Sequence, residues 1–122
     1  MTRKTHANMQ FIAHEINNKK VVELTTSEEI FKTLEEATDL MGNVYYQGFD
    51  KLIVYEKNIS PDFFDLKTKL AGDILQKFAT YNLQLAIVGD FNFDSKSLAD
   101  FIYESNKGNL INFKSTLQLA LS

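Results

Sequence analysis

The sequence predicts an α/β fold built on a mixed, mostly parallel sheet of about five strands with about four helices. Short β-favouring runs alternate with longer segments that carry apolar residues every three or four positions. Such alternation indicates parallel strands joined by right-handed helical crossovers, in the order β-β-α-β-α-β-α-β-α. At 122 residues the chain has the size of one domain. We expect a flexible N-terminus at 1–8 and a single domain over 9–122.

The first two strands are expected at 9–16 and 20–25. Asn17, Asn18 and Lys19 separate them and form a turn-prone trio. The pattern therefore predicts a β-hairpin at the start of the sheet.

The first helix is expected directly after the segment 25–29, Thr-Thr-Ser-Glu-Glu. A hydroxyl followed three residues later by glutamate is typical of a capping box. Apolar residues from Ile30 to Met41 share one helical face, and Gly42 is well placed to end the helix. The segment 43–50 fits either a further helical turn or a loop.

The second helix has the clearest start. It follows a continuous apolar run at 52–55, which is the pattern of a strand covered on both faces. Ser60 lies at the cap, Pro61 at the first helical position, and Asp62 in the first turn, where the helix dipole favours negative charge. The apolar stripe continues to about Thr80.

The remaining elements follow the same alternation. They are a strand at 83–88, a helix capped by Ser95 or Ser97 that stops near 105–108, a short strand at 110–113, and a last helix beginning at Ser115 or Thr116.

Composition removes several classes of function. The chain has no cysteine, which excludes disulfides and cysteine-ligated metal sites and suits a reducing cytoplasm. No apolar run reaches the length of a signal peptide or a membrane span. The net charge is −3 and Arg3 is the sole arginine, so direct nucleic-acid binding is not expected. The glycines show no dinucleotide or phosphate-loop spacing, and no cofactor is predicted.

One edge of the predicted sheet is the natural place for function. Ligands of open α/β sheets tend to bind beyond the carboxyl ends of the parallel strands. If the strands before them are neighbours, Glu56, Asp65 and Asp90 converge there, and such carboxylates can hold Mg²⁺ or Ca²⁺ or act as acid and base. Acidic residues at strand ends and first turns more often serve as caps, so we assign neither a metal site nor catalytic residues.

Ser60 has three interpretations: an N-cap, a nucleophile or a phosphorylation target. No G-x-S-x-G elbow surrounds it. His6 and His14, which are the only histidines, lie in or near the hairpin with no route to activate it. We therefore favour the N-cap.

Several blocks of the chain resemble the signature of the bacterial domain of unknown function 4180 family. They are EKNISPDFFDLKT at 56–68, LAGDILQKF at 70–78, LAIVGDF at 85–91, DFIYESNKG at 100–108 and NF at 112–113. The resemblance covers residues 9–121 and implies no established activity. It also implies a glycine after the Asp-Leu-Lys-Thr block, where this chain has Lys69, so a ligand contact by that glycine is in doubt here.

The element order is also similar to that of STAS domains, small regulatory modules typified by anti-sigma-factor antagonists. Their switch serine lies near the start of the helix after the third strand, and Ser60 falls in a comparable place. This is an analogy of fold, which is a weak basis for function.

Two functional hypotheses follow. The preferred one is a non-enzymatic STAS-like regulatory or protein-interaction module with an unknown protein partner. A homodimer that pairs an edge strand or an apolar helix face is compatible with such a domain, although no residue pattern demands it. Its expected surface consists of Glu56, Asn58, Ser60, Asp62, Asp65, Lys67 and Asp90. The alternative is a small enzyme or ligand-binding protein that uses Glu56, Asp65, Lys67 and Asp90 at the carboxyl edge.

Overall fold

The computed structural model describes residues 9–92 and 94–122, so the predicted flexible segment 1–8 lies outside the described residues. Five strands form one sheet in which they lie side by side in sequence order. The first pair is antiparallel and the other three pairs are parallel, which confirms the predicted mixed sheet and the predicted order of elements. The strands are β1 (Gln10–Ile16), β2 (Lys19–Thr25), β3 (Lys51–Tyr55), β4 (Gln84–Val88) and β5 (Ile111–Lys114).

The predicted hairpin is confirmed, with Asn17 and Asn18 as its two-residue turn. Both adopt left-handed backbone angles, with φ of 52° and 68°. Asparagine tolerates this region better than most residues, and a two-residue turn with two positive φ values matches the twist of the strands it joins. The turn fixes the register of β1 on β2, which runs without a bulge from Ile16 opposite Lys19 to Gln10 opposite Thr25.

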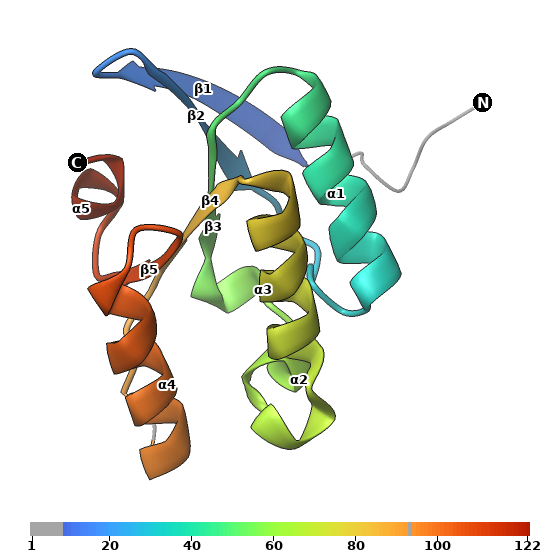
Figure 1. Ribbon diagram of the computed structural model, residues 1–122, viewed down its shortest axis with the longest axis vertical. Coiled ribbons are helices and arrows are strands. Elements are labelled where there is room, and N and C mark those ends of the chain that lie inside the picture. The colour runs from blue at the N-terminus through green and yellow to red at the C-terminus, as the bar shows by residue number, and fades with distance from the viewer. Residues whose placement is uncertain (1–8, 93) are drawn as a thin grey trace.

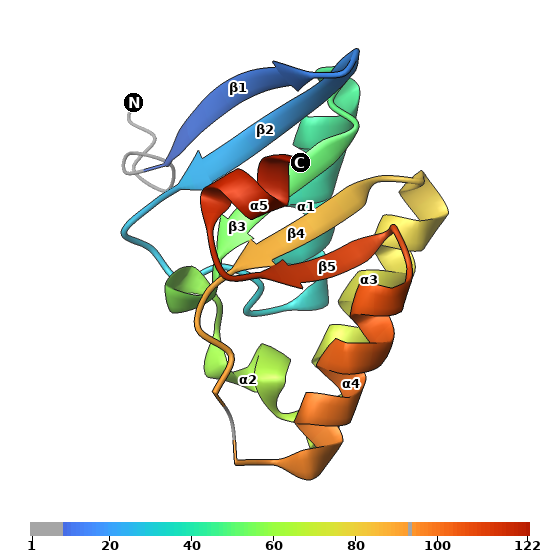
Figure 2. The ribbon, with the colours of Figure 1, turned by 90° about the vertical axis from the view of Figure 1, so that its left-hand side faces the viewer.

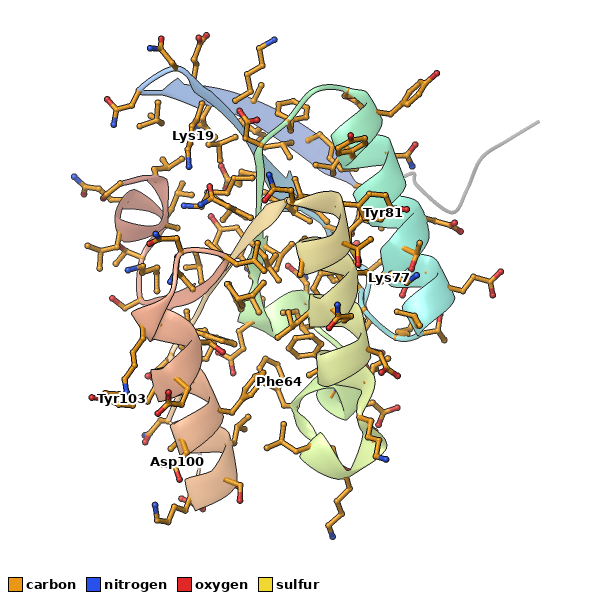
Figure 3. The ribbon with its side chains drawn as sticks, in the orientation of Figure 1. Lys19, Phe64, Lys77, Tyr81, Asp100 and Tyr103 are labelled. Atoms are coloured by element: carbon orange, nitrogen blue, oxygen red, sulfur yellow. The ribbon has the colours of Figure 1, made fainter. Side chains whose placement is uncertain are left out.

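The two faces of the sheet are covered unequally (Figures 1 and 2). Helices α1 (Leu34–Tyr46), α3 (Leu70–Tyr81) and α4 (Lys96–Lys107) lie on one face, over the larger apolar core. Tyr81 of α3 lies against Tyr45 of α1, with ring centroids 5.6 Å apart (Figure 3). On the opposite face, α5 (Leu117–Leu121) packs Ala120 over the centre of the sheet. No helix in the described part of the chain is both long enough and apolar enough to span a bilayer.

The predicted start of the first helix was wrong, and its end was one of the two alternatives left open. Thr33 is the N-cap, and its hydroxyl accepts a hydrogen bond from the backbone N–H of Glu36 at 3.1 Å. Residues 26–33 instead form an irregular segment, because Ile30 forms a parallel bridge with Ile59 and cannot also enter the helix. The helix continues through Gly42 to Tyr46, so the segment after Gly42 supplies the further helical turn.

The predicted second helix is divided into three parts, which raises the number of α-helices in the described residues from about four to five. A short helix α2 (Pro61–Phe64) is followed by a single 3₁₀ turn, η3 (Leu66–Thr68), and then by α3. Lys69 separates the turn from α3 and has a left-handed φ of 65°. Glycine is the residue for which this conformation has the lowest cost, so a glycine at this position would have a structural reason.

Replacing Lys69 by glycine is therefore expected to stabilise the protein. Left-handed backbone costs a residue with a Cβ about 1 kcal/mol more than it costs glycine, and the lysine side chain is exposed. The greater freedom of glycine in the unfolded chain offsets part of the gain. Urea unfolding should show a rise of several tenths of a kcal/mol, whereas Lys69→Ala should change stability little; a loss of stability in Lys69→Gly would contradict this explanation.

Candidate functional site

The carboxyl ends of β3 and β4 meet as predicted, because the two strands are neighbours. Glu56 directly follows β3, and its Oε1 accepts a hydrogen bond from the backbone N–H of Asp90 at 3.1 Å. The Glu56 side chain lies so close to Gly89 that an added Cβ there would be 2.5 Å from the Cβ of Glu56. Glu56 thus holds the backbone of the loop after β4, and Asp90 is exposed beside it.

Asn58 and Ser60 are both buried, at 9% and 4% exposed. The side-chain amide of Asn58 donates to the carbonyl of Thr26 at 2.8 Å, and the Asn58 carbonyl accepts from the N–H of Ile30 at 2.7 Å. The N–H of Ser60 donates to the carbonyl of Ile30 at 2.9 Å. These two residues therefore fasten the irregular segment 26–33 to the edge of the sheet.

The Ser60 hydroxyl is the N-cap of α2, where it accepts a hydrogen bond from the N–H of Asp62 at 3.3 Å. If capping is its role, Ser60→Ala is expected to cost about 1 kcal/mol of stability. The variant should still bind whatever the wild type binds. Thermal unfolding and a binding assay on the same variant would check both parts, and a loss of binding at unchanged stability would show that the hydroxyl has another task.

The remaining predicted site residues are exposed and do not form a common centre. Asp65 accepts the N–H of Lys67 at 3.1 Å and so caps the 3₁₀ turn η3, while Asp62 and Lys67 face solvent. Within residues 9–92 and 94–122, no three acidic or histidine side chains are grouped closely enough to hold a metal ion. The structure thus brings Glu56 to Asp90 but does not assemble Glu56, Asp65 and Asp90 into one metal-binding cluster.

The structure also has a groove beside α1, whose residues were not among the predicted site residues. It lies along the length of α1 and has a volume of about 550 Å³, and we name it the α1 groove. The segment 26–33 and the start of β1 complete its walls. The apolar side chains that line it are Met9, Phe11, Ile30, Phe31, Ala37 and Leu40. Phe11 is 41% exposed, so part of this apolar lining faces solvent.

The α1 groove has an acidic rim. Glu28, Glu35, Glu36 and Asp39 line it, against a single basic residue, Lys32. Glu36 accepts the backbone N–H of Lys32 at 2.8 Å and is therefore occupied with capping α1. In the described part of the chain, the other three carboxylates form no ion pair with a basic side chain. The acidic residues at 28–39 were the available signal, but only the segment 25–29 was interpreted, as a capping box.

A polar network on the opposite face of the sheet joins the first three strands. Glu23 of β2 is only 6% exposed. Its carboxylate lies 3.0 Å from His14 Nε2 of β1 and accepts a 2.7 Å hydrogen bond from the Tyr55 hydroxyl of β3. Burial and this contact with Glu23 raise the pKa of Tyr55 to about 12. Tyr55 thus remains a hydrogen-bond donor at neutral pH, and the buried glutamate is paired on both sides.

Lys51 is the basic counterpart at the amino end of the parallel strands. Its Nζ donates to the Ala120 carbonyl at the C-terminal end of α5. Burial lowers the pKa of Lys51, and the positive charges of Lys19 and Lys114 lower it further. A cation at a helix C-terminus is favoured by the helix dipole, so this contact holds α5 on the sheet.

Comparison with known proteins agrees with the resemblance carried by the sequence blocks at 56–113. No curated protein matches the chain. The model of a family described as a domain of unknown function (DUF4180) matches residues 16–122, which is most of the chain. The protein therefore belongs to the DUF4180 family.

Proposed function

We propose that the protein is a non-enzymatic interaction module, similar in element order to STAS regulatory domains, and that its binding surface is the α1 groove. The occupant that fits is a basic peptide segment of a partner protein, with one or two large apolar side chains flanked by lysine or arginine. The module would act in the reducing cytoplasm that its lack of cysteine suits.

The observation that carries this proposal is the combination of a partly exposed apolar lining with three rim carboxylates that form no ion pair within the described residues. Partner-binding grooves commonly bury apolar anchors at their centre and leave charged residues at the edge. Charges at such a rim contribute mainly to association rate and to choice of partner. The excess of carboxylates over Lys32 in the α1 groove disfavours an acidic partner and favours a basic one.

The bonding at the carboxyl edge supports the same proposal. One oxygen of Glu56 accepts the N–H of Asp90, and one oxygen of Asp65 accepts the N–H of Lys67, so both carboxylates help to hold the local backbone. Asn58 and Ser60 are buried and bonded to the backbone. Most of the expected surface residues thus have structural partners, whereas the α1 groove has acidic groups that form no ion pair within the described residues.

The test is selection of peptides by the full chain from a displayed library of random sequences. The proposal predicts enrichment of leucine or phenylalanine next to lysine or arginine, and weaker binding as salt is raised. Enrichment of acidic peptides, or selection of none, would count against it.

A charge reversal locates the binding surface on the chain. Glu35 lies in the first turn of α1 at the groove, and Asp73 lies in the first turn of α3 away from it. Both reversals to lysine lose the same favourable interaction with a helix dipole, so they are matched in stability. Glu35→Lys should weaken binding of a selected basic peptide about fivefold, the value of one exposed ion pair of about 1 kcal/mol. Asp73→Lys should not; equal effects of the two variants in a fluorescence titration would contradict the assignment.

A further inference from the structure

The outer edge of β1 carries backbone groups that have no partner in the described residues. On β2, both backbone groups of Lys20 bond toward β3: its N–H donates to the Asp50 carboxylate at 2.9 Å, and its carbonyl accepts from the Asp50 N–H at 2.7 Å. Strand residues point their backbone groups alternately to the two sides, so Val21 and Glu23 point toward β1. Their partners His14 and Ile12 point back toward β2.

By the same alternation, Phe11, Ala13 and Glu15 direct their N–H and carbonyl groups away from the sheet. Each is exposed. An open edge of this kind is a template for another strand, and proteins usually protect it with lysine, proline or a bulge. β1 has the sequence QFIAHEI and a register without a bulge, so it has no lysine, proline or bulge, and Glu15 is the one acidic residue on this edge.

The opposite edge of the sheet is partly covered by α4. The N–H of Phe113 in β5 donates to the side-chain oxygen of Asn106 at 2.7 Å, and Asn112 donates its side-chain amide to the Gly108 carbonyl at 3.0 Å. The C-terminal end of α4 therefore occupies the outer side of β5. Of the two sheet edges that the described residues form, the β1 edge is therefore the less covered and the better candidate for pairing with another strand.

We propose that β1 pairs antiparallel with β1 of a second copy of this chain, about a two-fold axis at Ala13, so that the two sheets become continuous. In this register Ala13 lies opposite Ala13 of the second copy. Phe11 of each copy lies opposite Glu15 of the other, which gives two further pairs. All three are pairs that exchange both hydrogen bonds, which gives about six bonds across the axis. The outward backbone groups of these residues are then satisfied in both strands.

The side chains fit this register. On the helix-covered face, the small Ala13 side chains meet at the axis and Glu15 faces Phe11. On the other face, Ile12 lies opposite His14 of the second copy. No two like charges are directly opposite, which would be destabilising. Shifting the strands by two residues leaves fewer outward residues paired, and centring them on Glu15 places two carboxylates face to face.

The pairing also connects the two α1 grooves. Phe11 lines the groove and lies on the same face as Glu15. In the proposed dimer, Glu15 of the second copy lies directly across from Phe11, so each groove gains one more carboxylate beside its apolar lining. The dimer would thus present two acidic grooves on the same side of one continuous sheet.

Charge variants at Ala13 test the proposal on the full chain. The wild type should have twice the monomer mass of 14.0 kDa by sedimentation equilibrium. Ala13→Glu and Ala13→Lys should each be monomeric, because like charges meet at the axis, and an equimolar mixture of the two should recover the dimer mass. Gln76→Glu, at an exposed position of α3, should remain dimeric. A monomeric wild type, or a dimer that both Ala13 variants preserve, overturns the proposal.

Hydrogen exchange of the wild-type protein provides a measurement that needs no variant to fold. The amides of Phe11, Ala13 and Glu15 should exchange more slowly as protein concentration rises, because dimerisation gives them acceptors. Ile12 and His14 bond within the hairpin and serve as internal controls, with protection that changes much less. Concentration-independent exchange at all five amides would show that this edge is free or is reserved for a strand from another protein, and would overturn self-pairing.

Discussion

Replacing Phe31 by alanine is expected to destabilise the protein by about 3–5 kcal/mol, the typical cost of truncating a buried phenylalanine. Phe31 is completely buried, and its ring lies 5.6 Å from that of Phe63 and 6.2 Å from that of Phe78. Phe31 also has a left-handed φ of 59°, so its packing must outweigh a backbone strain of about 1–2 kcal/mol. The loss of this ring therefore removes the contacts that hold the strained backbone in place.

Urea unfolding compares this variant with Phe101→Ala. Phe101 is only partly buried at the side of the core, so its truncation should cost clearly less. Because Phe31 joins the segment 26–33 to the core and lines the α1 groove, the folded fraction of Phe31→Ala should also bind selected peptides poorly. A cost equal to that of Phe101→Ala would mean that the Phe31 ring does not anchor the segment 26–33.

Adding a single methyl group at Gly89 is expected to have the second largest effect. The new Cβ would overlap Oε1 of Glu56 and lie 2.5 Å from its Cβ. The carboxylate can rotate away, but the Cβ of Glu56 cannot move without its backbone. Overpacking of this kind costs about 1–3 kcal/mol, and the variant should also lose the hydrogen bond from Asp90 to Glu56.

Replacing Gly72 by alanine is expected to change stability in the opposite direction. It lies inside α3, and an added Cβ there meets no atom within 4 Å. Alanine is favoured over glycine in a helix interior by about 1 kcal/mol, so Gly72→Ala should stabilise the protein. Thermal unfolding of Gly72→Ala and Gly89→Ala measures both effects. An unchanged stability in Gly89→Ala would contradict the close contact between the two loops of the carboxyl edge.

Local signals in the sequence were sufficient to predict the strands and most helix caps. The hairpin turn at Asn17 and Asn18, and the Ser60 cap followed by Pro61, depend on residues next to one another. The apolar runs of β3 and β4 are likewise visible directly. These features are short-range, so the chain reveals them without knowledge of the fold.

The first helix shows why local signals can also mislead. Both the segment 26–29 and the segment 33–36 have threonine followed three residues later by glutamate, which is the pattern of a capping box. The second one begins the helix because Ile30 is bridged to Ile59, a contact between residues far apart in the chain. Similarly, the break at Lys69 carries no glycine in this sequence, so nothing local marks its left-handed conformation.

The site was only partly predictable for the same reason. The topological rule correctly brought the residues after β3 and β4 to one edge. The partners that determine their roles are distant: Asn58 bonds to Thr26, and Glu56 to Asp90. The α1 groove arises from three separate segments, which no motif connects. Its acidic residues were visible in the sequence, but their shared rim was not.

The most direct test of the interaction proposal is to map a selected basic peptide on the isotope-labelled full chain by amide chemical shifts at low salt. Binding in the α1 groove predicts that perturbed amides gather at 9–11 and 28–43, and that they lose their shifts in Glu35→Lys but not in Asp73→Lys. Perturbations gathered instead at 60–67 and around Asp90 would place the binding surface at the carboxyl edge and contradict the proposed role of the α1 groove.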